Sequence, residues 1–261
     1  MTSSVGSAAS NEIRKEPSVR SRTGGSELGS MTFSAVGRAA GRPGDGTGGE
    51  RARLLLIPLG ATEQHGPHLP LATDTIIATA WATAAASRLD GAIVAPPLPY
   101  GSSGEHQRFP GTLSIGREAL ESLIIELTRS AAHFCDRVIL VSGHGGNAPV
   151  LEVTVARLVD EGHHVDWVVP RWSSGTEVDA HAGKTETSLL LHLRPDLVGR
   201  HAGVSGNTAP LSQLMPELLS GGVDAVAPNG VLGDTFGASA EHGAELFQQL
   251  VTGLVERISA G

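Results

Sequence analysis

From Arg53 onward, short apolar runs alternate with longer segments of helical spacing. The apolar runs occupy residues 53–59, 91–98, 137–143 and 164–170. Apolar residues recur three or four apart in residues 74–89, 117–134, 148–161, 185–193 and 239–257. Short buried runs predict strands, and the longer periodic segments predict helices. Strands that alternate with helices favour an α/β fold, in which a mostly parallel sheet carries helices on both faces.

Residues 1–50 differ in composition from the rest of the chain. They are rich in Ser, Gly and Arg and show almost no hydrophobic periodicity. A segment of this kind buries too little apolar surface to offset the entropy lost on ordering. We therefore expect residues 1–50 to be disordered or loosely docked, with 32–41 the part best suited to docking, and residues 51–261 to form one domain.

Composition excludes several classes of function. The formal net charge of −8 argues against binding to nucleic acid and provides no basic surface for a membrane. No apolar run approaches the roughly eighteen residues of a membrane-spanning helix, and no secretory signal is evident, so we expect a cytoplasmic protein. The single cysteine, Cys135, excludes an intrachain disulfide and a Cys-rich zinc site, and is expected to be a small buried residue.

A polar cluster follows each predicted strand, at residues 60–74, 99–112, 143–147 and 171–187. The carboxyl ends of parallel strands meet at one edge of a sheet, which is where α/β proteins form their sites. We therefore expect these four clusters to converge.

The first cluster contains Glu63, His65 and Asp74. In an extended chain, Glu63 and His65 point the same way, so both could address one ion. Asp74 opens the next helix and is either a ligand or a helix N-cap, a position that Asp favours. His68 lies between two prolines and is expected to be a solvated loop residue.

The later clusters supply further candidates. His144 follows the third strand within "VSGHGGN", where small neighbours allow close approach to a ligand; the spacing does not match a phosphate-binding Gly loop. "DAHAGKTETS" supplies His181, a ligand or proton donor, and Glu186. Glu186 is either a ligand or an acid favoured by the first turn of a helix.

Imidazoles and carboxylates without thiolates suit Zn, Mn or Fe(II), and two ions can be held if one carboxylate bridges them. Such ions lower the pKa of bound water and polarise a carbonyl oxygen, which suits hydrolysis. The sequence contains neither an H-E-x-x-H motif nor a G-x-S-x-G motif, so the usual zinc-protease and serine-hydrolase arrangements are unsupported.

Five motifs together resemble the creatininase family of metal-dependent amidohydrolases. They are "LIPLGATEQHGPHLPLATDT", "GSSGEHQRFPGTLSIG", "VSGHGGN", "HAGKTETS" and "GVLGDTFGASAEHGAEL". The resemblance covers roughly residues 53–257. It implies a creatininase-like layered α/β fold and a homo-oligomer, often a hexamer in this family.

The resemblance also implies roles for individual residues. Asp74 would bridge two divalent ions, with Glu63 and His144 on one ion and His65 on the other. Creatininase carries a further Glu ligand two residues after the histidine that matches His144, where this chain has Gly146. Glu186 would replace that ligand and take part in catalysis. His181 would assist proton transfer, while Lys184 stands where the family has Glu.

The implied activity is hydrolysis of an amide bond in a peptide or small amide. Within the family, the chain most resembles a branch that releases a C-terminal Val-Tyr dipeptide from a modified precursor peptide. The alternatives are hydrolysis of creatinine or another small amide, and a metal-stabilised binding protein without turnover. Glu105, His106 and Trp172 are candidate substrate-binding residues, although Glu105 and His106 suit a structural or interface role equally well. Trp167 and Trp172 belong either to a lid or to ordinary packing.

Overall fold

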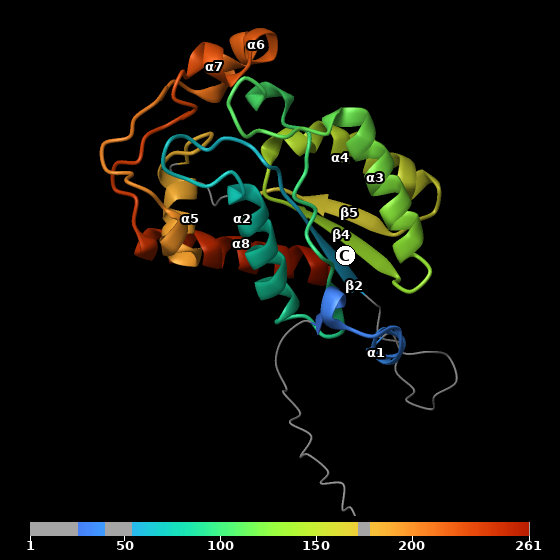
Figure 1. Cartoon of the computed structure of the whole chain (residues 1–261). Coiled ribbons are helices and arrows are strands. Elements are labelled where there is room, and N and C mark those ends of the chain that lie inside the picture. The colour runs from blue at the N-terminus through green and yellow to red at the C-terminus, as the bar shows by residue number, and fades with distance from the viewer. Residues whose placement is uncertain (1–25, 40–53, 172–177, 261) are drawn as a thin grey trace, which may run out of the picture.

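The computed structural model describes residues 26–39, 54–171 and 178–260, and its centre is a five-stranded sheet (Figure 1). The strands are β1 (Ser26–Glu27), β2 (Leu54–Leu59), β3 (Ala92–Val94), β4 (Arg137–Ser142) and β5 (Val165–Val168). Their spatial order is β1-β3-β2-β4-β5, and every neighbouring pair is parallel. The α/β fold with a parallel sheet is confirmed.

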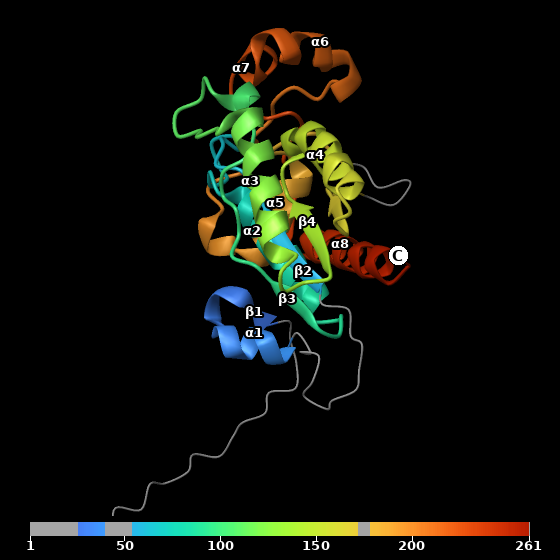
Figure 2. The same cartoon turned by 90° about the vertical axis from the view of Figure 1, so that its right-hand side faces the viewer.

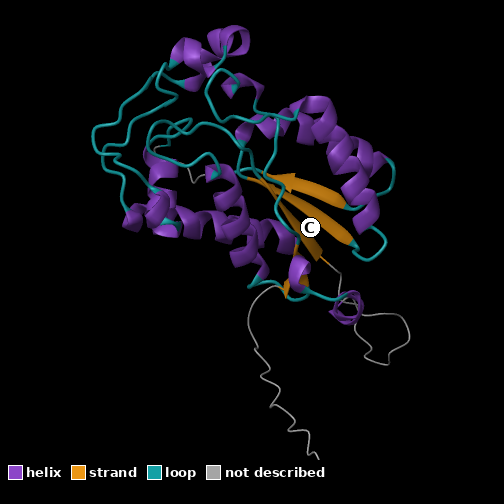
Figure 3. Ribbon diagram, in the orientation of Figure 1, coloured by secondary structure: helices purple, strands orange, loops and turns teal. Residues whose placement is uncertain are grey.

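Helices cover both faces of the sheet (Figure 3). The α-helices of the described residues are α1 (Phe33–Ala39), α2 (Thr73–Ala86), α3 (Gly116–Ala131), α4 (Ala148–Asp160), α5 (Lys184–Leu193), α6 (Leu211–Gly221), α7 (Val223–Val226) and α8 (Ala240–Ala260). Short 3-10 helices occupy Leu28–Ser30, Gly104–His106, Gly145–Asn147 and Pro195–Leu197.

The central strand β2 is buried along its whole length because both of its faces pack against helices. Leu54 and Leu56 join one core with α2, α5 and α8. Leu55, Ile57 and Leu59 point the other way and join a second core with α3 and α4. A strand covered on both faces reads as a continuous apolar run, which is why "LLLIPL" lacks the alternation of a half-exposed strand.

The four expected strands and five expected helices all form, with shifts of a few residues at their ends. β3 is the main exception, since only Ala92–Val94 are strand within the expected 91–98. Pro96 and Pro97 follow, and proline has no backbone N–H for a ladder bond. Helices α6 and α7, strand β1 and helix α1 were not predicted.

Part of the N-terminal segment packs on the domain. β1 extends the sheet beside β3, and Leu28 and Met31 pack against the core shared by α3 and α4. β1 and α1 lie at the opposite end of the molecule from α6 and α7 (Figure 2). The remainder of residues 1–50 lies outside the described residues.

Two minor expectations concern the core and the membrane. Cys135 is buried, as expected. Trp167 packs against the core, which favours ordinary packing over a lid. No helix within the described residues is both long and apolar enough to span a membrane.

Candidate metal centre

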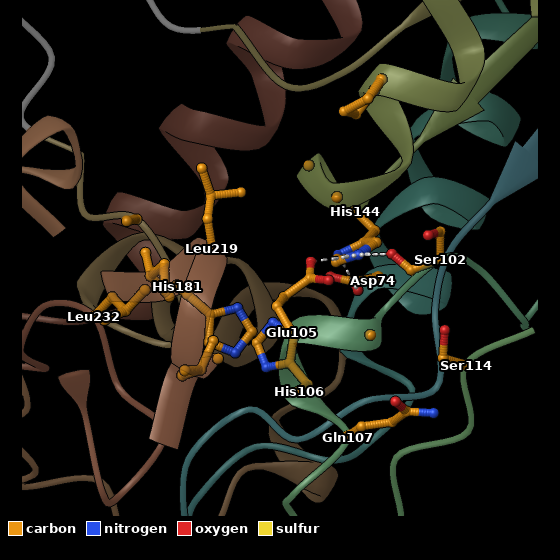
Figure 4. A pocket seen from close by; sticks show the side chains of 18 of the residues that line it. Asp74, Ser102, Glu105, His106, Gln107, Ser114, His144, His181, Leu219 and Leu232 are labelled. Atoms are coloured by element: carbon orange, nitrogen blue, oxygen red, sulfur yellow. Dashed lines mark hydrogen bonds and ion pairs between the residues drawn. The ribbon is translucent and has the colours of Figure 1, made fainter. Parts of the chain in front are cut away.

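A cavity of about 1040 Å³ lies at the carboxyl edge of the sheet (Figure 4). Its lining includes Asp74, Glu105, His144 and His181, from four different segments of the chain. Apolar side chains of α6 form another part of the lining: Leu211, Met215, Leu218 and Leu219. The predicted convergence of the strand-end clusters is therefore confirmed for the described residues.

Glu63, Asp74 and His144 form the first group of potential ligands, and all three are buried. Nδ1 of His144 lies 3.2 Å from Oε1 of Glu63 and 3.5 Å from Oδ2 of Asp74. Asp74 does not cap α2, whose N-cap is Ala72 without a side-chain cap bond. The N-cap alternative is wrong, because the Asp74 carboxylate turns towards the imidazoles instead.

His65, His181 and Glu186 form a second group on the other side of Asp74. Nε2 of His65 lies 3.1 Å from Oδ1 of Asp74 and 3.8 Å from Oε2 of Glu186. Asp74 thus offers one carboxylate oxygen to each group. Oε2 of Glu186 also accepts a 2.6 Å hydrogen bond from the backbone N–H of Ala182.

Backbone carbonyls orient two of the imidazoles. Nδ1 of His65 lies 3.1 Å from the carbonyl oxygen of Glu63, so it carries the hydrogen and Nε2 faces Asp74. Nε2 of His144 lies 3.2 Å from the carbonyl oxygen of Ser102, so Nδ1 faces the carboxylates. A carbonyl partner of this kind fixes the tautomer of a metal-ligating histidine.

The carboxylates of the site favour positive charge on the neighbouring imidazoles. Burial lowers the pKa of His65, but Asp74, Glu186 and Glu63 outweigh it and raise that pKa to about 10. Burial likewise opposes a charge on His144, yet Glu63 and Glu105 hold its pKa well above the usual value. For Glu63, burial favours the neutral acid, but the surrounding imidazoles hold its pKa well below the usual value.

The residues fit a divalent cation. Oε1 and Oε2 of Glu63 and Oδ2 of Asp74 are buried without a hydrogen-bond partner. Leaving a buried carboxylate oxygen unpaired is costly, whereas a bound cation would satisfy it. Together with the imidazole nitrogens, these oxygens form the donor set that suits Zn, Mn or Fe(II).

The structure places Glu105, and not Glu186, over Gly146. Oε1 of Glu105 lies 3.5 Å from Nε2 of His144, and a Cβ at position 146 would collide with both atoms. Figure 4 shows the Glu105 carboxylate pointing towards His144. Glu186 lies beside His65, within a group that could hold an ion, so its role as the ligand that replaces the missing acid stays a prediction.

His68 and His106 are both buried, which the sequence did not predict. His68 is buried, with Nε2 at 2.8 Å from Oγ1 of Thr187, so the solvated-loop interpretation is wrong. His106 is also buried, with Nε2 at 3.4 Å from Oε1 of Glu63. Burial lowers the pKa of His106 to about 2, so the ring is neutral. Trp172 lies outside the described residues.

Sequence reasoning missed Gln64. Its side-chain nitrogen lies 2.8 Å from Nδ1 of His106 and 3.1 Å from Nε2 of His181. The only available signal was its position between two predicted ligands, which indicates proximity but not which way the amide points.

Comparison with known proteins agrees with this geometry. The creatininase family model, described as creatinine amidohydrolase, matches residues 47–258. The chain belongs to the creatininase family. It is therefore a hydrolase that acts on amide C–N bonds.

Two kinds of family member are particularly similar. The mycofactocin precursor peptide peptidase of Mycolicibacterium smegmatis is 50% identical over 210 residues, which are 78% of this chain and 84% of that protein. A crystal structure of creatinine amidohydrolase is 27% identical, with a TM-score of 0.72, and the match covers 92% of this chain and 98% of the other.

Solved creatininases include a Zn–Zn type and a Mn form. The Zn–Zn type, a point mutant, is 26% identical with a TM-score of 0.69, covering 89% of this chain and 96% of the other. The Mn form is 27% identical with a TM-score of 0.70, covering 90% of this chain and 97% of the other.

Proposed function

We propose that the chain is a metal-dependent peptidase that releases a C-terminal Val-Tyr dipeptide from a modified mycofactocin precursor peptide. The observation that carries this proposal is the group of buried carboxylate oxygens without a hydrogen-bond partner beside an open cavity of about 1040 Å³. A cavity of that size exceeds what a small cyclic amide needs and suits the end of a peptide. The similarity to the Mycolicibacterium smegmatis peptidase supports the same substrate.

We further propose two divalent ions per subunit, Zn, Fe(II) or Mn. Glu63, Asp74 and His144 would hold one ion. His65, Asp74 and Glu186 would hold the other, since Asp74 offers an oxygen to each side. When bound, such ions supply a lowered pKa for water and a Lewis acid for the carbonyl oxygen.

The protein side chains then manage position and protons. His181 is a buried member of the second group, with Nδ1 at 3.9 Å from Oε1 of Glu63. It is placed to take a proton from the attacking water and to return it to the departing nitrogen. Glu105 and His106 line the same cavity and are the proposed substrate contacts, together with Trp172 from the segment outside the described residues.

Two alternatives make different predictions. A metal-stabilised binding protein would enclose its ions with protein ligands, whereas here the groups adjoin an open cavity. Creatinine hydrolysis would use the same residues of this chain on a much smaller substrate. Creatinine is the substrate in the name of the 27% identical creatinine amidohydrolase.

The deciding experiment uses metal-loaded protein with two substrates. A peptide ending in the modified Val-Tyr is incubated in one reaction and creatinine in the other, and products are followed by mass spectrometry. We expect an intact Val-Tyr dipeptide to be released. Turnover of creatinine alone would reject the peptidase, and no turnover of either would favour the binding protein. The homo-oligomer, such as a hexamer, is tested separately by light scattering, and the cytoplasmic location by fractionation.

A further inference from the structure

The amide of Gln64 lies between two imidazoles of the site. Its side chain is buried, at 5% exposure. Nε2 lies 2.8 Å from Nδ1 of His106 and 3.0 Å from the carbonyl oxygen of Gly230. Oε1 accepts a 2.8 Å hydrogen bond from the backbone N–H of Gly66. This last contact fixes which end of the amide is oxygen, because a backbone N–H can only donate.

Counting hydrogens determines the tautomer of each ring. Nε2 of His181 lies 2.9 Å from the backbone carbonyl oxygen of Gln64. A carbonyl oxygen only accepts, so Nε2 of His181 carries the hydrogen and Nδ1 does not. The side-chain nitrogen of Gln64 has two hydrogens, which then go to Gly230 and to Nδ1 of His106. Nδ1 of His106 can accept only if its hydrogen resides on Nε2.

We propose that Gln64 is a positioning residue that holds the hydrogens of His106 and His181 on Nε2, through its side chain and its backbone respectively. The two rings consequently present opposite groups to Oε1 of Glu63. His106 presents an N–H at 3.4 Å, and His181 presents a bare Nδ1 at 3.9 Å. The N–H of His106 is therefore turned towards the carboxylate, while Nδ1 of His181 is free to accept a proton.

This assignment deepens the proposed hydrolysis and rests on it for its catalytic meaning. In that reaction, one proton of the attacking water moves to Nδ1 of His181 as the C–O bond forms. The same proton then moves to the nitrogen as the C–N bond breaks. A His181 ring with its hydrogen on Nδ1 could not accept the first proton at that nitrogen, so the tautomer decides which nitrogen of the ring can work as a base.

The test is imidazole ¹⁵N NMR spectroscopy of the Zn-loaded and the chelated full chain. His106→Gln and His181→Gln variants assign the two rings by loss of their signals. In the unsubstituted protein, we expect both rings to show a protonated Nε2 and an unprotonated Nδ1. A protonated Nδ1 on His106 would overturn the role of the Gln64 side chain. A protonated Nδ1 on His181 would overturn the role of the Gln64 backbone carbonyl.

Substitution of Gln64 separates the two contacts. In Gln64→Glu, a carboxylate oxygen faces His106, so Nδ1 of His106 should gain a hydrogen while His181 stays unchanged. In Gln64→Leu, which adds no charge, the Nδ1 signal of His106 should move to that of a nitrogen that accepts no hydrogen bond. An unchanged His106 signal in the folded variants contradicts the proposal. Thr187→Val is the matched control: it removes the contact with His68, 2.8 Å long, and should leave both rings unchanged.

Kinetics provide a readout beyond structure. Gln64→Leu should lower kcat by about 10- to 100-fold, the usual effect of losing an outer partner of a metal site, with KM nearly unchanged. An unchanged kcat would contradict the positioning role. The NMR signals need no substrate, so a failure of the peptide to react would reject the proposed function and leave the tautomer assignment intact.

Discussion

Oε1 of Glu105 approaches Nε2 of His144 to 3.5 Å across the backbone of Gly146. The two residues come from different loops, one after β3 and one after β4. The approach is possible because residue 146 has no side chain, so the absence of an acid at this position creates the space that another acid occupies.

Gly146→Ala should therefore disturb the site. The added Cβ would collide with Glu105 and with His144, and His144 is buried and cannot move away freely. We expect the free energy of unfolding to fall by about 1–3 kcal/mol and the metal affinity to fall about tenfold or more. Calorimetric titration and denaturant unfolding measure the two effects. Gly145→Ala is the control, since its Cβ would meet nothing within 4 Å. Equal effects of the two substitutions would contradict the collision.

Asp74→Ala should abolish binding of both ions. Its two carboxylate oxygens face His65 and His144 on opposite sides, and no other described side chain is placed to serve both. We expect activity to fall by at least about 100-fold and the metal content measured by mass spectrometry to fall with it. Asp160→Asn, on the exposed end of α4, should retain both. Retention of full activity by Asp74→Ala would reject the bridging role.

Two glycines of α8 should respond in opposite directions to alanine. A Cβ at Gly243 would collide with the backbone of Ser188 in α5, so Gly243→Ala should destabilise the protein by about 1–3 kcal/mol. A Cβ at Gly253 would meet nothing within 4 Å, so Gly253→Ala should stabilise it by roughly 0.5–1 kcal/mol through helix propensity. Urea unfolding measures both. Stabilisation by Gly243→Ala would show that α5 and α8 are packed differently.

His68 should make the metal-free protein sensitive to acid. Burial, helped by the nearby His201 and His65, lowers the pKa of His68 from 6.5 to about 4. Below pH 6.5 the unfolded chain takes up a proton that the folded protein does not. Stability is therefore present above pH 6.5 and is lost as the pH falls towards 4, by up to about 3 kcal/mol.

His68→Gln should flatten this part of the pH profile in chelated protein, because glutamine does not titrate there. Denaturant unfolding at pH 7, 5.5 and 4 provides the comparison. His133→Gln, on the surface, should keep the slope of the unsubstituted protein. A His68→Gln profile that falls as steeply as the original would show that His68 is not the source.

The parts of the fold and site that sequence predicted depend on local pattern. Apolar runs and helical spacing located β2, β4 and the helices around them. What sequence could not supply depends on contacts between distant segments. His68 is buried against Thr187, which lies 119 residues further along the chain. Glu105 approaches His144 across Gly146, which has no side chain. The wall formed by α6 likewise follows from packing that no local pattern reveals.

The stretch that follows β2, residues 60–65, has no room for an extra residue. Gly60 is pressed against the backbone of Thr75, and the next residues reach Glu63, Gln64 and His65 without a turn that could absorb an extra residue. Deleting or inserting one residue between Leu59 and Glu63 would move each of these three side chains into its neighbour's place. A ligand would then stand where the amide of Gln64 contacts His106, so a change in the length of this loop should disrupt both the ligand set and the orientation of that imidazole.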